Sequence, residues 1–251
     1  NGAARTGSYT PEMERQAGIR PIVVYTGPYY REAMSDQFFS ELSIRQPEFD
    51  LGVESGSRAT QIAEIIKRIE PVLDEVHPAL VVVFGDLDAT LAAALTAGKL
   101  GLPVAHVEAG LRDFDRTAAD ELNSFLIDAI STELLVTHQS GLENLCQEGR
   151  STGRVHFVGN VMIDALVAFR PVWEGRAKII PRRLGLEPSQ PYAVLSLDQP
   201  LPVDGPLKLA WLLDGIQMLG GQMPVIFPVH PRLWPRLAGH DLVVAERDSP
   251  R

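Results

Sequence analysis

The feature that most constrains the fold is the regular alternation of short β-type runs with helical segments. Strands that alternate with helices at this spacing predict a parallel sheet built from β-α-β units. Nearly continuous β-branched runs are typical of strands buried on both faces. The runs in the first two thirds of the chain are 22–25, 80–84, 104–107, 133–136 and 155–158. The sequence therefore predicts an α/β fold with parallel sheets flanked by helices.

This alternation of strands and helices is interrupted once, over residues 171–191. Prolines and glycines punctuate a basic and weakly periodic stretch there, which is typical of a linker or an interdomain crossing. The alternation then resumes with β-type runs at 192–197, 224–227 and 242–245. We predict an N-terminal Rossmann-like lobe over 1–170, a linker over 171–191 and a partial C-terminal Rossmann-like lobe over 192–251.

Composition excludes several classes of function. The formal net charge of -9 argues against a nucleic-acid partner, which would favour a basic face. No apolar run approaches the ~20 residues that a membrane span needs, so we expect no membrane partner. Cys146 is the single cysteine, and the first residues lack an apolar signal region. Both observations predict a cytoplasmic protein without disulfides.

Two acids follow successive β-type runs. One run ends in Gly85-Asp86, and the next continues through His106 and Val107 into Glu108. The carboxyl ends of parallel strands meet at one edge of a sheet, where α/β proteins bind ligands. Two alternatives remain open here, because Asp86 suits a helix N-cap and Glu108 could be solvated or pair with Arg112. His106 suits a hydrogen-bonded core position as well as a site.

Further candidates lie beyond these two strand ends. Asp120 opens a helical segment, where an acid is also favoured by the helix dipole alone. The Gly159-Asn160 junction follows a strand and could present backbone N–H groups to an anion. In the second lobe, His230 and Arg232 flank a proline, and arginine is well suited to bidentate phosphate contacts. A positively charged surface turn is the alternative for that pair.

The sequence gives no sign of a metal site or a bound cofactor. Its six histidines are scattered, with no His-x-x-x-His pair and no Cys-x-x-Cys pair. No dinucleotide fingerprint and no P-loop is present either. We therefore expect neither a metal nor a cofactor.

Several collinear motifs resemble those of one family. They read VVYTG at 23–27, FGDLDATLAAALTAGKLGLPVAHVEAGLR at 84–112, FVGNVMIDAL at 157–166 and FPVHPR at 227–232. Over about residues 22–236 the chain resembles the non-hydrolysing UDP-N-acetylglucosamine 2-epimerases. That resemblance implies a two-domain, glycosyltransferase-B-like architecture.

The resemblance also implies a reaction and its residues. In that family the C2 proton of UDP-N-acetylglucosamine is removed, UDP leaves, and UDP adds back after the face changes to give UDP-N-acetylmannosamine. Asp86 and Glu108 fall on the family's catalytic carboxylates, and Asp120 falls on a third that is normally Glu. We predict these three as catalytic residues. The residues predicted to bind the UDP-sugar are His106, Arg112, Asn160, His230 and Arg232. Family members are commonly homodimers that feed polysaccharide synthesis, so both properties are implied as well.

The chain departs from the family pattern in the parts that hold UDP. No Gly-Thr-Arg-Pro-Glu loop precedes Ile22, and Asp198 and Gln199 replace a functional His-Arg pair. The family's Asp-Ser-Gly-Gly turn has no counterpart before Arg251, which implies a truncated second lobe. Two alternatives to an active epimerase therefore stay open: an impaired homologue that binds a nucleotide sugar or a protein without turnover, and a fragment.

Overall fold

A computed structural model gives the fold of most of the chain. The residues described are 18–27, 46–54, 56–115, 117–150, 152–177, 179–187, 190–196 and 214–229. The chain divides into two compact units, Asn1–Arg170 and Pro171–Arg251.

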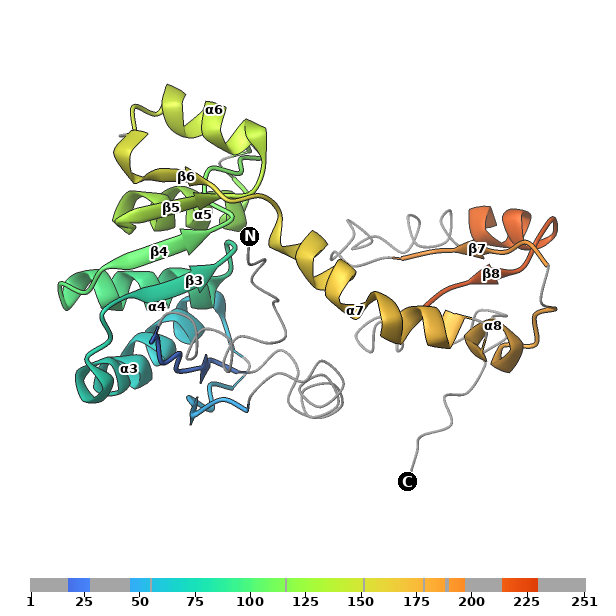
Figure 1. Cartoon of the computed structure of the whole chain (residues 1–251), viewed down its shortest axis with the longest axis horizontal. Helices are drawn as coiled ribbons and strands as arrows, with labels where there is room; N and C mark the ends of the chain where they lie inside the picture. The colour runs from blue at the N-terminus through green and yellow to red at the C-terminus, as the bar shows by residue number, and fades with distance from the viewer. Residues whose placement is uncertain are drawn as a thin grey trace. The chain divides into compact units, whose positions relative to one another are not determined.

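A four-stranded parallel sheet forms the centre of the first unit (Figure 1). Its strands are β3 (Val81–Phe84), β4 (Val104–Val107), β5 (Glu133–Val136) and β6 (Val155–Phe157), in the order β3-β4-β5-β6. Val83, His106 and Leu134 lie side by side across the first three strands. A separate parallel pair consists of β1 (Val24–Tyr25) and β2 (Phe49–Asp50).

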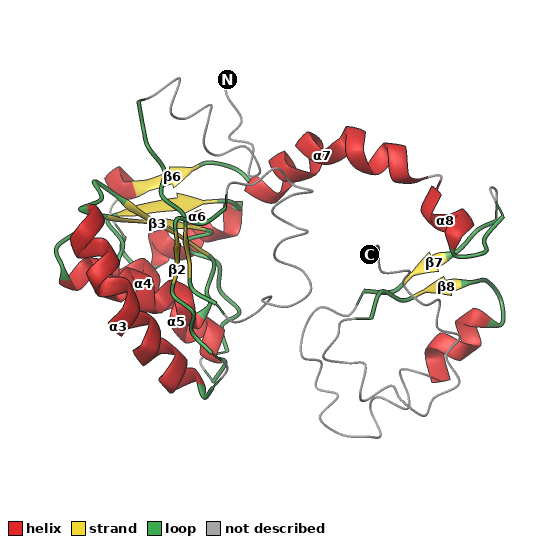
Figure 2. Ribbon diagram, turned by 90° about the horizontal axis from the view of Figure 1, so that it is seen from below, coloured by secondary structure: helices red, strands yellow, loops and turns green. Residues whose placement is uncertain are grey.

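Strands that are neighbours in sequence are also neighbours in this sheet. Right-handed crossovers in one direction then place the connecting helices on one face. The helices of this unit are α3 (Arg58–Val76), α4 (Asp88–Lys99), α5 (Ala119–Ile130), α6 (Gln139–Gln147) and the start of α7 (Val161–Ala177). Figure 2 shows α3, α4 and α5 on the same side of the strands.

The core lies between that face of the sheet and the helices. Ala92, Ala94 and Ala97 of α4 are completely buried, because their small side chains let this helix lie close to its neighbours. Ile65 and Ile69 of α3 complete the same apolar cluster. The sequence prediction of an α/β fold with parallel sheets flanked by helices is confirmed.

Local signals explain where α3 begins and ends. The Ser57 hydroxyl accepts a hydrogen bond from the Thr60 N–H, as an N-cap does. His77 takes a left-handed conformation with φ of 46° and closes the last turn through its N–H to the Leu73 carbonyl. Pro71 lies inside the helix without ending it.

Helical segments occupy much of residues 171–191, the stretch in which the sequence predicts a linker. Helix α7 continues from the first unit to Ala177, and α8 (Ile179–Arg183) follows it. Pro181 is compatible with α8 because it lies in the first turn, where its missing N–H would have no helical partner. Beyond this segment, β7 (Ala193–Val194) and β8 (Val225–Ile226) pair in parallel, and residues 214–220 are helical.

No helix in the described part of either unit combines the length and the apolar character needed to cross a membrane.

Candidate active site

The two predicted carboxylates follow β3 and β4 at the same edge of the sheet. The Gly85 N–H donates to the Val107 carbonyl at 3.1 Å, and the Glu108 N–H donates to the Leu135 carbonyl at 3.0 Å. Both residues then leave the strand conformation with positive φ, 65° at Gly85 and 75° at Glu108. A Cβ atom at Gly85 would lie 3.4 Å from Glu108 Oε2, so the Glu108 carboxylate lies directly against the β3 turn.

Positive φ is uncommon for a residue other than glycine, and such strained positions cluster at functional sites. Glu108 is one of three described non-glycine residues in this region of conformational space. Its strain is therefore a local reason to connect this turn with function.

The environment of Asp86 favours its protonated form. Burial raises the pKa of the Asp86 carboxyl above its ordinary value, and the negative charges of Asp120 and Asp113 raise it further. The charge of His106 and a backbone hydrogen bond oppose this effect. Helix capping does not explain Asp86, because the N-cap of α4 is Leu87, which provides no side-chain cap.

His106 fixes the turn that carries Asp86. Its Nε2 lies 3.0 Å from the Gly85 carbonyl oxygen, and its Nδ1 lies 2.6 Å from Asp128 Oδ1. Because a carbonyl can only accept, Nε2 carries a proton and donates it to Gly85. The side chain is 1% exposed, so His106 acts on the site through Gly85.

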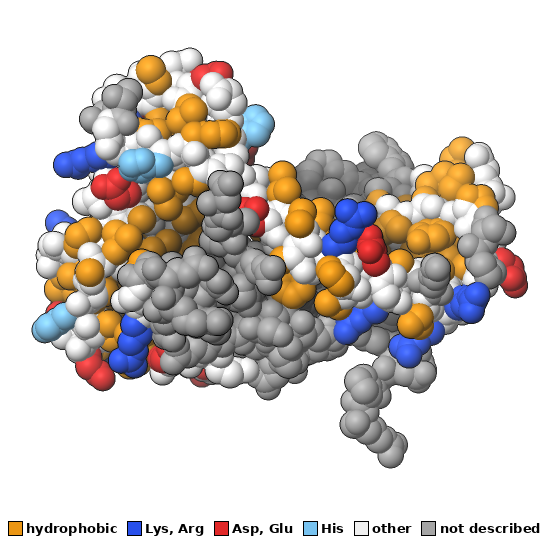
Figure 3. Space-filling model, viewed as in Figure 1, with side chains coloured by type: hydrophobic (Ala, Val, Ile, Leu, Met, Phe, Trp, Pro, Cys, Tyr) orange, Lys and Arg blue, Asp and Glu red, His pale blue; other side chains and the backbone are white. Residues whose placement is uncertain are grey.

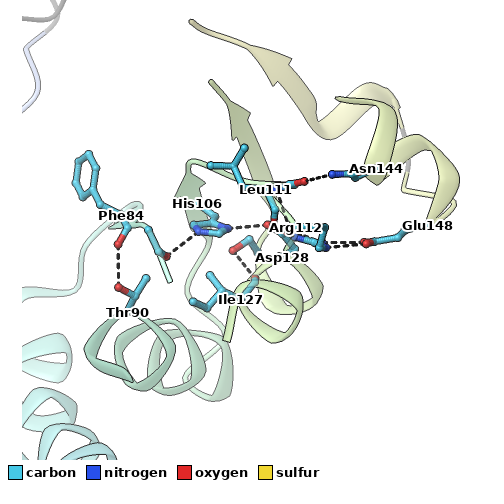
Figure 4. A network of polar contacts seen from close by, with 12 residues as sticks. Phe84, Thr90, His106, Leu111, Arg112, Ile127, Asp128, Asn144 and Glu148 are labelled. Atoms are coloured by element: carbon cyan, nitrogen blue, oxygen red, sulfur yellow. Dashed lines mark hydrogen bonds and ion pairs between the residues drawn. The ribbon is translucent and has the colours of Figure 1, made fainter. Parts of the chain in front are cut away.

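Asp128 is the centre of a buried network that reaches the loop after β4 (Figure 4). Its Oδ2 accepts the Gly110 N–H at 3.0 Å and Arg112 Nη2 at 2.7 Å. Arg112 also donates from Nε and Nη2 to the two oxygens of Glu148, at 2.8 and 2.9 Å. Burial lowers the pKa of Arg112, but hydrogen bonds to Glu148 and Asp128 outweigh it and raise the pKa overall.

The Arg112 geometry separates two interpretations of Glu108. Arg112 pairs with Asp128 and Glu148, and its side chain is 2% exposed. It is therefore not the ion-pair partner that would make Glu108 purely structural. Like His106, Arg112 is placed to hold the loop in position, since little of its side chain could reach a ligand.

Asp120 lies at the start of α5 and is joined to two other helices. Arg58, the first residue of α3, forms ion pairs with Asp120 and with Asp88 of α4, the latter at 2.7 Å. Hydrogen bonds to Asp88 and Asp120 raise the pKa of Arg58. Burial raises the pKa of Asp88, but hydrogen bonds from Arg58 and Asn123 outweigh it and lower the pKa overall.

The other acid at the start of α5 has a structural role. Glu121 is buried, and its Oε2 accepts the Asp113 N–H at 2.7 Å, which fixes the β4–α5 loop. The Asp120 side chain is instead 57% exposed. Asp120 is therefore the member of this acidic pair that a ligand can reach.

The remaining predicted residues lie elsewhere. Asn160 follows β6, and its Oδ1 accepts the Met162 N–H at 2.9 Å at the start of α7. His230 and Arg232 lie outside the described residues, as do Asp198 and Gln199. Within the described ranges, no group of three or more His, Cys, Asp or Glu side chains could hold a metal ion.

Sequence reasoning missed Arg58, Asn123 and Asp128. Asn123 Nδ2 donates to both the Asp86 carbonyl and Asp88 Oδ1 at 2.9 Å, so it joins the site turn to α4. The signal for Asp128 was its helical phase, because it follows Ser124 by four residues on the buried face of α5. A carboxylate on that face requires buried partners.

The fold and the site define an α/β protein with two acidic residues directly after the carboxyl ends of two adjacent parallel strands. Comparison with known proteins identifies the family within this class of α/β proteins. The family model for UDP-N-acetylglucosamine 2-epimerase matches residues 11–245, and the chain belongs to this family.

Individual relatives agree with that assignment. A UDP-N-acetylglucosamine 2-epimerase of Methanococcus maripaludis is 33% identical over 224 residues, covering 88% of this chain and 61% of the relative. A UDP-2,3-diacetamido-2,3-dideoxy-D-glucuronate 2-epimerase of Pseudomonas aeruginosa is 31% identical, covering 86% of this chain and 60% of the relative. The chain thus spans about three fifths of the length of these relatives.

A solved structure shows the same fold. The UDP-GlcNAc 2-epimerase of Methanocaldococcus jannaschii in complex with UDP-GlcNAc and UDP matches with a TM-score of 0.80 and 33% identity. The match covers 90% of this chain and 62% of that one.

Proposed function

We propose that this chain provides the sugar side of a UDP-N-acetylglucosamine 2-epimerase site, which interconverts UDP-GlcNAc and UDP-ManNAc. The observation that carries the proposal is the placement of Asp86 and Glu108 after adjacent strands, with the Glu108 carboxylate lying against Gly85, the residue before Asp86. Family membership supports the choice of substrate. The chemistry is elimination and re-addition of UDP.

In the proposed reaction, one carboxylate removes the C2 proton and another returns a proton to C2. A carboxylate takes the C2 proton as the C1–O bond breaks, and UDP leaves with the bonding electron pair. UDP then adds back to the unsaturated sugar while the other carboxylate returns a proton to the opposite face of C2. Asp86 suits the role of acid because its raised pKa keeps the proton available at higher pH than an ordinary Asp. Glu108 is the proposed partner, and Asp120 is the proposed third carboxylate.

The proposed binding residues divide into two groups. His106 acts through the Gly85 carbonyl, and Arg112 acts through Asp128, which accepts the Gly110 N–H. Asn160, at the start of α7, and His230 and Arg232 are proposed to contact UDP. We also propose that the protein is cytoplasmic, and that it is homodimeric and its product supplies polysaccharide synthesis, the last two as the family resemblance implies.

Exchange with solvent tests the chemistry directly. The chain is incubated with UDP-GlcNAc in D2O, and NMR follows both UDP-ManNAc formation and deuterium at C2. We expect both signals in the unaltered chain and a loss of about 100-fold or more in Asp86→Asn and Glu108→Gln. Glu143→Gln, an exposed change on α6, is the control and should retain the activity. Undiminished exchange in both site variants would contradict the proposal.

A second candidate is a protein that binds a nucleotide sugar without turning it over. It is favoured by Asp198, an acid where the family has a functional His, and by the shorter Asp120 that Arg58 already holds. Calorimetric binding of UDP-GlcNAc without deuterium incorporation would favour this candidate over the epimerase.

A further inference from the structure

One buried carboxylate, that of Asp128 on α5, is connected to both turns that carry the proposed catalytic acids (Figure 4). Its Oδ1 lies 2.6 Å from His106 Nδ1, and His106 Nε2 donates to the Gly85 carbonyl just after β3. Its Oδ2 accepts the N–H of Gly110, two residues after Glu108. The Asp128 side chain is completely buried, so it can influence the site only through these neighbours.

The contacts of His106 require a proton on each of its ring nitrogens. Nε2 faces a carbonyl oxygen and Nδ1 faces a carboxylate oxygen. A carbonyl and an ionised carboxylate can only accept. Asp128 is held in its ionised form by the donors on its Oδ2, the Gly110 N–H and the Arg112 guanidinium at 2.7 Å. A neutral imidazole has one N–H, and it would leave one ring nitrogen facing an oxygen with no proton between them.

The balance of charge in the buried network agrees with this protonation state. Figure 3 shows Lys, Arg, Asp and Glu side chains at the surface of the molecule, where water solvates them. His106, Asp128 and Arg112 are instead 1%, 0% and 2% exposed. Glu148, the second partner of Arg112, is 24% exposed. Two positive and two negative charges cancel in this set when His106 is charged, whereas a neutral His106 would leave a net negative charge that is costly to bury.

We propose that Asp128 is a positioning residue that serves both carboxylates of the site. One of its oxygens holds His106 as an imidazolium, which fixes the Gly85 turn through a hydrogen bond. Its other oxygen fixes the Gly110 turn that follows Glu108. The proposal rests on the proposed function for the reaction that the carboxylates perform, but the protonation of His106 can be measured without turnover.

The charge of His106 also gives Asp128 an electrostatic effect on Asp86. Burial and two neighbouring carboxylates, those of Asp120 and Asp113, raise the pKa of the Asp86 carboxyl. The positive charge of His106 lowers it. A change that leaves His106 neutral should therefore raise the pKa of Asp86 further.

NMR of the unaltered full chain, with 15N-labelled histidine, tests the protonation of His106. Correlations from the carbon-bound ring protons report each nitrogen, and at pH 7 both nitrogens of His106 should be protonated. His138 is the internal control, because its Nδ1 accepts the Ser140 N–H at 3.3 Å and should carry no proton. This measurement needs no substitution at Asp128. A single protonated nitrogen on His106 would overturn the proposal.

The variant Asp128→Asn keeps the size of the side chain but has one oxygen acceptor instead of two. Gly110 and Arg112 both donate to that oxygen, so the amide group should donate to His106 Nδ1 and leave the ring with a proton on Nε2 only. We expect the loss of one ring proton and a higher pKa of Asp86 than in the unaltered chain. Carboxyl carbon NMR measures that pKa.

Glu148→Gln is the matched control, because it removes a carboxylate from the same network without changing a partner of His106. It should retain both ring protons of His106 and the Asp86 titration. Equal changes in the two variants, or an unchanged pKa of Asp86 in Asp128→Asn, would overturn the proposal.

Kinetics of deuterium exchange at C2 supply the last readout. In Asp128→Asn, kcat should fall about tenfold or more while KM stays within about twofold, because a completely buried side chain does not contact the substrate. A raised KM at unchanged kcat would overturn the proposal. Absence of turnover in the unaltered chain would contradict the proposed function, and the ring protons of His106 would still decide the role of Asp128.

Discussion

At the scale of single residues, Arg58 joins the starts of three helices next to the proposed acid. It neutralises Asp120, whose negative charge otherwise favours the protonated form of Asp86. Replacing Arg58 by Gln should therefore raise the pKa of Asp86 above its value in the unaltered chain. Carboxyl carbon NMR titration measures that pKa without any need for turnover.

The control for this change is on the same helix. Lys67→Gln removes the same charge from an exposed position of α3 and should leave the Asp86 titration unchanged. Arg58→Lys keeps the charge and should restore part of the effect. A lower Asp86 pKa in Arg58→Gln would contradict the assigned role of Arg58.

Asp86 should also reduce stability at neutral pH. Its pKa is raised in the folded state, so folding favours the protonated form, and the ionised form carries a penalty above the unfolded pKa. Asp86→Asn should therefore raise the melting temperature at pH 7 while it removes activity. Near pH 3 the carboxyl is protonated in both states, and the two proteins should melt together.

Asp88, two residues further along the chain, should have the opposite effect on stability. The pKa of Asp88 is lowered in the folded state, so its contribution to stability is present above the unfolded pKa and disappears as pH falls. Asp88→Asn should lower the melting temperature at pH 7. A pair of melting curves at both pH values separates Asp86 from Asp88, and equal shifts in the two variants would contradict this account.

At the scale of elements, the loop after β4 and the start of α6 approach each other through two glycines. A Cβ atom at Gly110 would lie 2.4 Å from the Gly141 carbonyl oxygen, and φ at Gly110 is 80°. Gly110→Ala should therefore lower the free energy of unfolding by about 3 kcal/mol or more, as overpacking and backbone strain combine. Urea denaturation measures this loss.

Gly101→Ala is the control for backbone strain alone. Gly101 has φ of 73°, but a Cβ atom there would meet nothing within 4 Å. Gly101→Ala should lower the free energy of unfolding by about 1 kcal/mol. If both variants lose the same free energy, the close approach of the β4 loop to α6 does not limit stability.

Some elements could be predicted to the residue, and the reason is local. β4 and β5 have the limits expected from sequence, 104–107 and 133–136. In each, the apolar pattern has a single period and turn-forming or polar residues bound it. The last turns of α7, after Arg170, were not predicted because Pro171 and Gly175 indicate a linker, although the structure accommodates both inside the helix.

In the site, too, some features follow from local sequence and others depend on long-range packing. Asp86 and Glu108 could be found because strand ends meet at one edge of a parallel sheet. The bond between His106 and Asp128 joins residues 22 apart in sequence, and it depends on how α5 packs against β4. No local pattern in the sequence predicts that packing.

At the scale of the whole molecule, burial is concentrated in the first unit. Every buried residue in the described ranges lies between Gly27 and Leu145. The described residues of the second unit are all exposed or intermediate, including Trp173 and Val194. Since buried apolar area is the main source of stability, the two units should differ in local stability.

Native-state hydrogen exchange should reveal this difference across the chain. Amides of β4 and α4 should exchange at the slow rate set by global unfolding, because their side chains lie in the core. Amides of α8, β7 and β8 should exchange orders of magnitude faster, because opening them exposes little apolar surface. Mass spectrometry of peptides from both units measures the two rates in one sample. Equal protection in the two units would show that interactions beyond burial stabilise the second one.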